Sequence, residues 1–367
     1  MSILQFAGFD IFPAQANAGN TMPVHGAGIT GTPYASQYNL YVSNASHLIG
    51  VSGLEAHKMG SGSKRRNGLV FYRPAGSSTW ATMSLSKPAR LGQGAWTRTY
   101  NFTVKDVSPV DLDTAVSILT ATVNGYSLNA YLFGLHANKA VLVNGQAVAG
   151  VTFERNREYA IEVRLSRQAT DTTNQMTLDV RMDGALIRSL NIAPISLTNN
   201  DFGVSLGMTS STNITTNRTM IFSDIIIGDD QLLGPQLVLP ATVDAVNSTG
   251  GWEKEGNADP VTSLNDQSDT TFFTSPVDNG SLSLRMKVGE DSAVPLRTAQ
   301  VYVRAARDVA AGRGLVVKAE DGSGATIGGP TTISTTTSFA DYQSFNLNLA
   351  KVGDLATTAV KINAVAP

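Results

Sequence analysis

Three carboxylates lie within seven positions of the segment IFSDIIIGDD, residues 221–230, at Asp224, Asp229 and Asp230. Clustered acids can hold a cation, and two carboxyl groups about 5 Å apart can cleave a glycosidic bond. An extended strand advances about 3.3 Å per residue, which separates Asp224 from Asp229, and adjacent residues point to opposite sides. We therefore interpret Ile221–Ile227 as the closing strand of a domain. The last two acids, Asp229 and Asp230, then mark the point where the chain leaves this strand and enters a linker.

Both faces of this strand carry apolar residues. Strict alternation places Ile221, Ile225 and Ile227 on one face with Ser223, and Phe222 and Ile226 on the other with Asp224. Apolar residues on both faces are typical of a strand that is covered on both sides.

Other acids have spacings that would suit chemistry. Asp111 with Asp113, and Glu253 with Glu255, are two apart and would share a strand face. The chain has no E-x-D-x-x-E run, which sandwich-fold glucanases carry, so we interpret these acids as non-catalytic. The segment with Asp266, Ser268 and Asp269 suggests a calcium loop, but the glycine and glutamate of an EF-hand loop are missing, and a polar turn fits better.

Two segments could contact phosphate groups. Gly26, Gly28 and Gly31 match G-x-G-x-x-G, but neither a strand before them nor a helix after them is indicated, so a loop is the better interpretation. Lys64-Arg65-Arg66 could bind a polyanion or form a solvated loop, and a net charge of −2 favours the loop.

The remaining chemical side chains are few. The four histidines, His25, His47, His57 and His136, show no metal-ligand spacing, and there is no G-x-S-x-G motif and no cysteine. The aromatic residues Tyr34, Tyr38, Tyr41, Trp80, Trp96 and Trp252 could stack on sugars, but core packing is the commoner use. We assign no catalytic, cofactor-binding or metal-binding residue, and we expect no cofactor.

The composition limits the classes of partner. Charged residues make up only 15% of the chain, and the net charge is −2, so we expect neither nucleic-acid binding nor membrane insertion. The first residues lack the basic and apolar regions of a secretory signal, which favours folding in a cytoplasm.

Period-two alternation dominates the elements that must position any site. Residues 159–165 and 176–182 alternate apolar and polar side chains, as half-buried antiparallel strands do. Asn144-Gly145 and Asp183-Gly184 are suited to tight hairpin turns. The only helix that the pattern suggests, and weakly, lies near 339–345. The chain therefore reads as all-β, with sandwich architecture.

The pattern changes after Asp230. The segment GPQLVLPATVDAV carries two prolines and reads as a short extended linker, and a second strand-rich block begins near Trp252. We predict two β-sandwich, jelly-roll-like domains, residues 1–231 and 232–367.

One long segment resembles a known domain family. The residues from VLVNGQAVAG through MTLDVRMDGALIRSLNI look like the middle of a concanavalin-like (laminin-G-like) jelly roll, with Tyr159 in the aromatic place and Asp183-Gly184 as the turn. FSDIIIGDD resembles the closing strand of such domains. The resemblance implies that this strand returns to pair near the first strand, ILQFAGFDIF.

The linker region is similar to a segment of tailed-bacteriophage virion proteins. The matching positions are Gly234, Val238, Pro240, Asp244, Trp252, Asp266, Asp269 and Thr271-Phe272. The resemblance implies a phage particle protein that is assembled in the bacterial cytoplasm.

From this resemblance we expect a non-enzymatic structural component of the tail, collar or fibre. Its expected partners are other virion subunits and further copies of itself. The alternative is a carbohydrate-binding host-attachment protein that contacts a host-surface glycan. A β-sandwich glycosidase is disfavoured because its carboxylate motif is missing.

Overall fold

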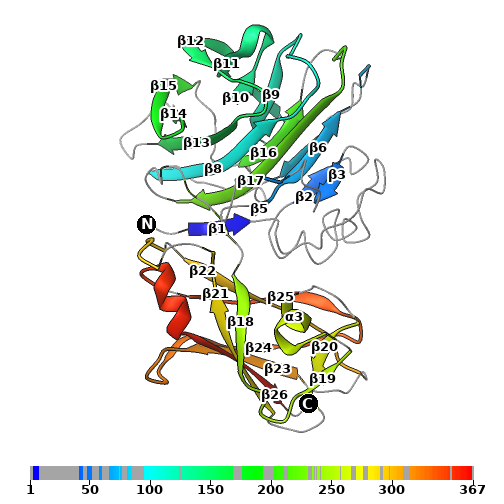
Figure 1. The fold of residues 1–367 in the computed structure, drawn as a ribbon. Coiled ribbons are helices and arrows are strands. Elements are labelled where there is room, and N and C mark those ends of the chain that lie inside the picture. The colour runs from blue at the N-terminus through cyan, green and yellow to red at the C-terminus, as the bar shows by residue number, and fades with distance from the viewer. Residues whose placement is uncertain are drawn as a thin grey trace. The chain divides into compact units, whose positions relative to one another are not determined.

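The computed structural model describes most of the chain from residue 95 onward and short segments before it. The described residues are 3–7, 41–43, 48–51, 58–59, 66–73, 75–76, 81–84, 95–123, 126–167, 176–192, 202–209, 214–229, 234, 236, 238–239, 241–256, 258–265, 270–275, 280–289, 292–296, 298–308, 314–347 and 349–365. In these residues the protein is almost entirely β-structure, as the sequence predicts (Figure 1).

The chain divides into two compact units. The first comprises Met1–Gly60 and Arg65–Val238, and the second comprises Ser61–Lys64 and Leu239–Pro367. Residues 232–238, which the sequence analysis placed in the second domain, therefore belong to the first unit.

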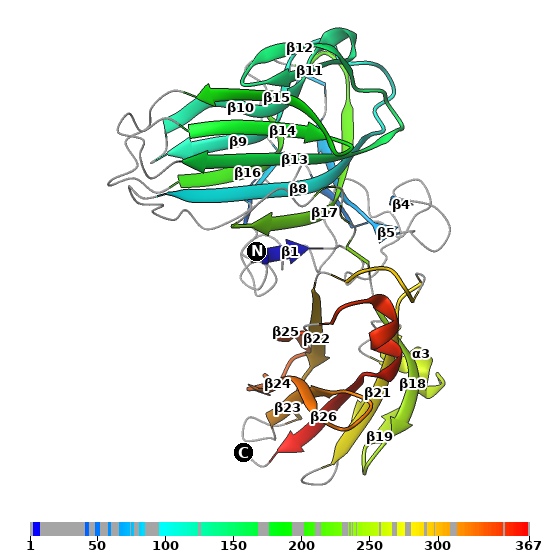
Figure 2. The ribbon, with the colours of Figure 1, turned by 90° about the vertical axis from the view of Figure 1, so that its left-hand side faces the viewer.

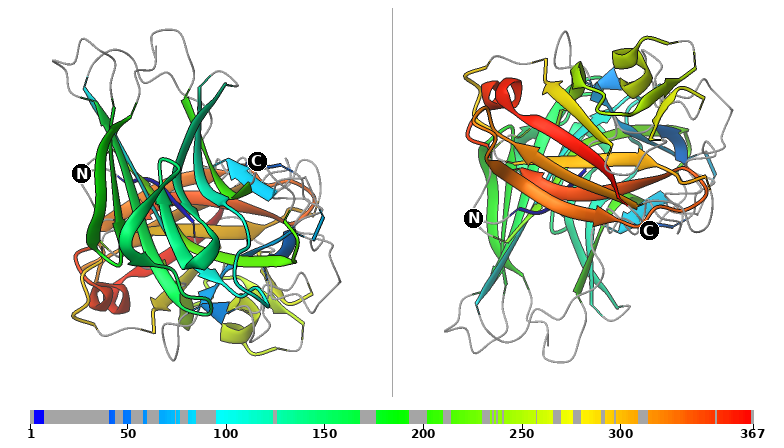
Figure 3. Two further views of the ribbon diagram at one scale, coloured as in Figure 1. Left: turned by 90° about the horizontal axis from the view of Figure 1, so that it is seen from above. Right: turned by 90° about the horizontal axis from the view of Figure 1, so that it is seen from below.

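The first unit contains two large antiparallel sheets. The eight-stranded sheet has the order β15-β14-β13-β8-β17-β6-β3, with β1 pairing to β17, and the seven-stranded sheet has the order β12-β11-β10-β9-β16-β7-β2. The left-hand view of Figure 3 shows the two layers edge on. The strands are β1 (Ile3–Ala7), β2 (Tyr41–Ser43), β3 (Leu48–Val51), β6 (Leu69–Arg73), β7 (Ala81–Ser84), β8 (Trp96–Asp106), β9 (Val116–Val123), β10 (Tyr126–Leu135), β11 (Ala140–Val143), β12 (Gln146–Thr152), β13 (Glu158–Arg167), β14 (Met176–Met182), β15 (Ala185–Ile192), β16 (Phe202–Thr209) and β17 (Arg218–Gly228). A small separate pair is formed by β4 (Lys58–Met59) and β5 (Arg66–Asn67).

Both predicted hairpins are confirmed. Asn144 and Gly145 have positive φ angles of 51° and 74° between β11 and β12. Asp183 and Gly184 have φ angles of 51° and 84° between β14 and β15. Positive φ at both central residues gives a turn whose twist matches that of the flanking strands.

Aromatic rings fill the core between the two sheets. Phe102 of β8 meets Phe133 of β10 edge to face, with ring centroids 6.3 Å apart, so this contact joins the sheets. Phe222 lies 5.2 Å from Phe71 and 6.2 Å from Phe102, between centroids. All four side chains are fully buried, and such ring pairs stabilise by about 1 kcal/mol beyond their area.

A β-bulge at Asp224 changes the face pattern of β17. Asp224 has a φ of 52°, and the register against β8 slips between Ser223, which faces Thr103, and Ile226, which faces Asn101. The extra residue reverses the alternation, so Ile226 and not Ile227 lies on the face of Ser223. The strict alternation predicted from the sequence is therefore wrong beyond Asp224.

Two other predictions for this strand hold. All residues from Arg218 to Gly228 except Thr219 are buried, so both faces are covered. The strand also pairs with β1, where Ile3 faces Gly228 and Ala7 faces Ile225. The closing strand thus returns to the first strand of the chain, as the concanavalin-like resemblance implies.

The chain that follows β17 packs over part of the outer face of the eight-stranded sheet. Glu162 accepts a hydrogen bond from Gly234 N at 2.7 Å, and Asn101 Nδ2 donates to Gly234 O at 2.8 Å. Asp224 Oδ1 accepts a hydrogen bond from Val238 N at 2.8 Å. Polar side chains on the outer face therefore fix the end of the first unit against its own sheet.

The second unit is a smaller sandwich. Its five-stranded sheet has the order β18-β21-β26-β23-β24, and two further pairs are β19-β20 and β22-β25. The elements are β18 (Thr242–Ser248), β19 (Glu253–Glu255), α3 (Pro260–Asn265), β20 (Phe272–Thr274), β21 (Ser281–Lys287), β22 (Ala299–Ala305), β23 (Gly314–Glu320), β24 (Thr326–Ile333), β25 (Ala340–Leu347), the 3-10 helix η5 (Val352–Thr357) and β26 (Ala359–Val365). The prediction of a helix near 339–345 is wrong, because Ala340–Leu347 form strand β25.

Leucine, isoleucine and valine side chains from the five-stranded sheet form the core of this unit, with Trp252, Phe273, Tyr342 and Phe345 packed against them. The short helix α3 begins at the cap residue Asp259, whose Oδ1 accepts from Val261 N and Thr262 N. It ends at Asn265, whose side-chain amide bonds both backbone groups of Val243.

Candidate functional site

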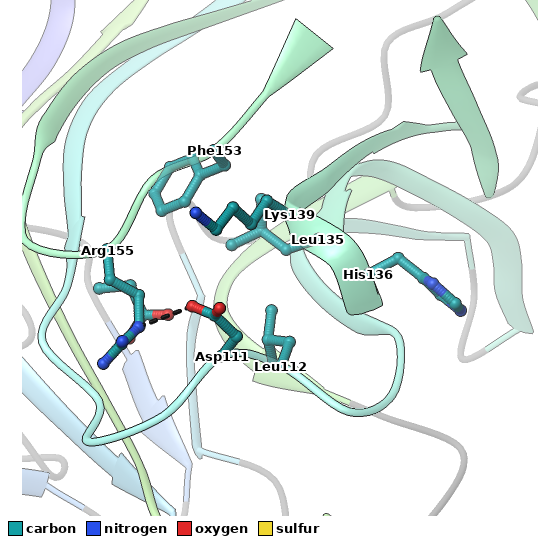
Figure 4. Close-up of a pocket in the computed structure, with 8 residues that line it drawn as sticks. Asp111, Leu112, Leu135, His136, Lys139, Phe153 and Arg155 are labelled. Atoms are coloured by element: carbon teal, nitrogen blue, oxygen red, sulfur yellow. Dashed lines mark hydrogen bonds and ion pairs between the residues drawn. The ribbon is translucent and has the colours of Figure 1, made fainter.

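A charged pocket opens at one end of the first unit, where β8 and β10 end and β12 leads into β13 (Figure 4). The space amounts to about 240 Å³, including the part that is open to solvent. The lining residues are Asp106, Asp111, Leu112, Leu135, His136, Lys139, Phe153 and Arg155. The pocket thus combines three apolar side chains with acids, cations and an imidazole.

The turn after β10 places His136 and Lys139. The chain passes through the short 3-10 segment η4 (Ala137–Lys139), where Asn138 and Lys139 have φ angles of 61° and 62°. His136 N donates to Ala140 O at 2.9 Å, and Phe153 N donates to Lys139 O at 2.8 Å. Positive φ is uncommon for lysine, so these bonds hold a conformation that the sequence does not favour locally.

Arg155 fixes the loop between β8 and β9 against this turn. Its Nε donates to Asp111 Oδ1 at 2.7 Å. Its Nη1 donates to the carbonyl oxygens of Ser108 and Pro109 at 2.9 and 2.8 Å. The planar guanidinium suits several acceptors in fixed directions, so the loop wall of the pocket is held in one arrangement.

Arg218 holds the same loop from beneath. Its side chain is fully buried, and it donates to the carbonyl oxygens of Val110 and Asp111. Asp113 lies 3.8 Å from its guanidinium, which is ion-pair distance. Burial lowers the pKa of Arg218, while Asp106 and Asp113 oppose that shift.

Asp106 is the buried acid of the pocket. Its Oδ1 accepts from Ser108 N at 2.8 Å, and only 2% of the residue is exposed. Burial raises its pKa above the ordinary value, although the bonds from Ser108 and the charges of Arg218 and Arg155 act against the rise. A carboxyl group with a raised pKa beside a pocket can hold and release a proton closer to neutral pH.

Lys139 and His136 complete the polar lining. Lys139 Nζ lies 2.6 Å from Glu154 Oε2, and this bond raises the pKa of the lysine, so it stays a cation. His136 is exposed, and Figure 4 shows its ring turned away from the other labelled side chains. Among the described lining groups, Arg155 is bonded to the lining acid Asp111, whereas Lys139 is bonded to Glu154.

The acids that the sequence analysis considered in pairs have separate partners or lie exposed. Asp111 binds Arg155, whereas Asp113 accepts from Thr215 N at 3.3 Å. Glu253 and Glu255 are exposed on β19.

Of the three acids of IFSDIIIGDD, the structure describes Asp224 and Asp229. Asp224 is fully buried and accepts from Ser223 Oγ and Val238 N, both at 2.8 Å. Asp229 follows the strand, and Asp230 lies outside the described residues. Asp224 shapes the end of the unit, as the interpretation of a closing strand requires.

Several candidates fall outside the described residues. They are Gly26, Gly28, Gly31, Lys64, Arg65, His25, His47, His57, Asp266, Ser268, Asp269, Tyr34, Tyr38, Trp80 and Pro240. Of the remaining aromatic candidates, Trp96 is half-buried in β8 and Trp252 packs against the second core. In the described part of the chain, no group of three or more histidine, aspartate or glutamate side chains is placed to hold a metal ion.

Sequence reasoning named Asp111 and His136 but missed most of the other residues that build the pocket. Asp106, Arg155 and Arg218 come from three distant segments and meet only through the fold. Their signal was weak: a charged residue at the end of an apolar strand, as at Asp106 and Arg218.

No helix among the described residues has the length and apolar character needed to cross a bilayer.

No protein-family model and no curated protein matches the chain. Solved structures that resemble it include the alginate lyase Aly36B, with 8% identity and a TM-score of 0.39, over 62% of this chain and 97% of that one. An endo-beta-1,4-glucuronan lyase from the fungus Trichoderma reesei has 10% identity and a TM-score of 0.37, over 62% and 96%. The alginate lyase vAL-1 from Chlorella virus has 9% identity and a TM-score of 0.36, over 47% and 89%.

These comparisons correct the expected function. The sequence predicts a non-enzymatic structural component of a phage virion, whereas the similar solved structures are named as alginate or glucuronan lyases, which are enzymes. The expectation of a non-enzymatic structural protein is therefore wrong. At identities of 8–10% the likeness concerns the β-sandwich fold alone, and no residue role or substrate is transferred from it.

Proposed function

We propose that the protein is carbohydrate-active and that the charged pocket of the first unit engages an acidic polysaccharide. The observation that carries this proposal is the joint presence of Arg155, Lys139 and the buried acid Asp106 around a small opening with an apolar wall. The names of the similar structures indicate which polymers to test first, alginate and glucuronan.

The charged groups of the lining suit the acidic group of a uronate residue. A sugar ring presents apolar C–H faces, which the half-buried Leu112 can contact, whereas Leu135 and Phe153 are buried. Its carboxylate is a planar anion, which a guanidinium binds in fixed geometry and a lysine attracts as a point charge. Arg155 is already held by the loop, so binding would cost little ordering of that side chain.

The same arrangement supports proton transfer. Cleavage of a uronate chain by elimination breaks a C–H bond beside the carboxylate and the bond to the glycosidic oxygen, and forms a C=C bond. A base takes the proton from carbon, and the leaving oxygen receives a proton. A single carboxyl group balances the step when its ionised form accepts the proton from carbon and then donates it to that oxygen. We assign the proton-transfer role to Asp106, because its raised pKa lets it carry a proton closer to neutral pH than an ordinary aspartate.

The test uses the purified full chain with alginate, glucuronan and a neutral glucan. We expect retardation of the protein in gels that contain either polyuronate, and ultraviolet absorbance from the conjugated product of elimination. Neither is expected with the neutral glucan. Absence of both retardation and product with the polyuronates would overturn the proposal.

Two arginines two positions apart provide a matched pair. Arg155 lines the pocket and pairs with Asp111, whereas Arg157 pairs with Asp183 and does not line it. We expect Arg155→Gln to weaken binding by about tenfold or more, since bonds to charged groups contribute about 1.5–3 kcal/mol. Arg157→Gln should leave binding unchanged, and equal losses in both variants would contradict the proposed site.

Asp106→Asn separates proton transfer from binding. Asparagine keeps an oxygen that can accept from Ser108 N, so the loop should stay in place while the acid is lost. We expect binding to persist and product formation to fall. Unchanged product formation would exclude the role assigned to Asp106.

The resemblance to tailed-phage virion proteins stays a prediction, as do self-association, contact with other virion subunits or a host-surface glycan, and a place in the particle. A carbohydrate-active protein is compatible with each of them. Proteomics of purified particles tests the location, and light scattering tests self-association.

A further inference from the structure

We infer that the outer face of the five-stranded sheet in the second unit is a separate binding surface for an acidic polysaccharide chain. The surface is the cationic face, defined as the outward side chains of β18, β21, β26 and β23, which are neighbours in the sheet (Figure 2). The identity of the ligand rests on the proposed function, whereas the surface itself does not.

The strand register brings lysines together on this face. Lys361 lies directly opposite Lys318 on one side and Ser283 on the other. The adjoining positions Val360 and Ile362 are buried in the core, so alternation directs Lys361 outward. Two like charges directly opposite each other destabilise a sheet, and here Glu320, which pairs with both lysines, offsets part of that repulsion.

Each of the two acids on this face serves two bases. Glu320 pairs with Lys318 at 2.8 Å and with Lys361. Asp244 pairs with Arg285 at 2.7 Å and Lys287 at 2.9 Å. The two clusters therefore hold four positive and two negative charges.

The charge excess is local to this face. Residues 239–367 contain ten Lys and Arg against fourteen Asp and Glu, so this part of the chain is acidic as a whole. The cationic face has the opposite balance. A patch whose sign differs from its surroundings attracts a ligand of opposite charge to that place.

Neighbouring bases keep both acids ionised. Hydrogen bonds from Lys318 and Lys361 lower the pKa of Glu320, and bonds from Lys287 and Arg285 lower the pKa of Asp244. The excess of positive charge is therefore stable at neutral pH. Lys287 is 62% exposed and Arg285 45% exposed at the side chain, so both are accessible to a ligand.

The neutral groups on the face favour a sugar chain over a nucleic acid. Ser281, Ser283 and Asn363 lie among the cations and can bond hydroxyl groups. Among the described residues of the four strands, no aromatic side chain faces outward, whereas proteins that bind single strands stack bases on aromatic rings. Tight binding of a duplex also needs more phosphate contacts than four cations provide.

The experiment measures retardation of the full chain in native gels that contain alginate, a neutral glucan or duplex DNA. Lys318→Gln with Lys361→Gln should weaken retardation by alginate by about fivefold, which corresponds to about 0.5 kcal/mol for each of the two lost contacts. A matched control is Lys254→Gln with Lys351→Gln, which removes the same charge from the same unit off this face. The control should retain near wild-type retardation.

Glu320→Gln gives the opposite effect and keeps the inference testable if the lysine variant folds poorly. It removes a competing anion, so we expect stronger retardation by alginate although the pairing within the face is lost. Weaker retardation in this variant, equal losses in the control, or stronger retardation by DNA than by alginate would overturn the inference.

Arg155→Gln in the same gels distinguishes this inference from the proposed function. A loss only in Arg155→Gln leaves the pocket as the binding site and overturns the cationic face. A loss only in the double lysine variant supports the cationic face and counts against the pocket. No retardation of the wild type by any polyuronate overturns both.

Discussion

Two groups of charged side chains, one in each unit, are used in opposite ways. In the first unit, Arg218 and Asp224 are fully buried and bond backbone atoms of loops and chain ends. In the second unit, the clusters around Glu320 and Asp244 lie on the outer face of a sheet, and their bonds join side chains to side chains.

The buried charges of the first unit hold loops and chain ends in place, whereas the charges on the sheet face of the second unit are accessible to a ligand. A buried charge leaves water at a cost of several kcal/mol, so it persists only where many bonds satisfy it, and the structure around it becomes rigid. Exposed pairs contribute about 0–1 kcal/mol and can exchange one partner for a ligand. The first unit thus has a preformed pocket, and the second has an adaptable surface.

The largest effect expected from this comparison follows the loss of Arg218. Arg218→Met keeps much of the side-chain volume but leaves the carbonyl oxygens of Val110 and Asp111 without their donor. Breaking such a buried polar contact costs about 3–5 kcal/mol. Urea unfolding of the first unit should show this loss, whereas Lys361→Gln in the second unit should change the unfolding free energy by less than about 1 kcal/mol. Comparable losses in the two variants would contradict the distinction between the units.

A smaller effect is expected at the bulge. Asp224→Ala removes the acceptor of Val238 N and places alanine at a φ of 52°, so we expect a loss of about 2 kcal/mol. Asp224→Asn is the control, because asparagine tolerates this conformation and keeps an acceptor oxygen. Hydrogen exchange at Val238 should rise in the alanine variant and much less in the asparagine variant. Equal exchange in both would show that Asp224 does not hold the chain after β17.

The sequence predicted elements whose cause is local. The turns at Asn144-Gly145 and Asp183-Gly184 need positive φ angles that those residue types adopt easily, and the alternation in residues 159–165 directs one face to the core. The concanavalin-like resemblance added the pairing of the closing strand with the first. The bulge at Asp224 was missed, since an extra residue does not interrupt an apolar run.

The pocket could not be predicted for a different reason. Asp111 drew attention because Asp113 is two positions away, but its partner Arg155 is 44 residues distant. Arg218 reaches the same loop from more than 100 residues away. Pattern analysis detects spacing along the chain, whereas these contacts depend on which strand ends meet at one end of the sandwich.

The smallest effect concerns pH, and the two units should differ in its direction. Burial raises the pKa of Asp106, so the folded first unit binds its proton more tightly than the unfolded chain does. Its stabilising contribution is present below the ordinary aspartate pKa and is lost as the pH rises through the raised value. Neighbouring bases lower the pKa values of Glu320 and Asp244, so their contribution is present above the ordinary values and is lost as the pH falls through the lowered ones.

Variants at these acids isolate the two directions. Hydrogen exchange followed by peptide between about pH 3 and pH 7 reports on each unit separately. In the wild type, we expect the first unit to lose stability as the pH rises, and Asp106→Asn should abolish that loss. We expect the second unit to lose stability as the pH falls, and Glu320→Gln should abolish that loss. A change of the same sign in both units would mean that burial does not dominate at Asp106, and that its carboxyl group behaves like the base-paired acids Glu320 and Asp244 of the cationic face.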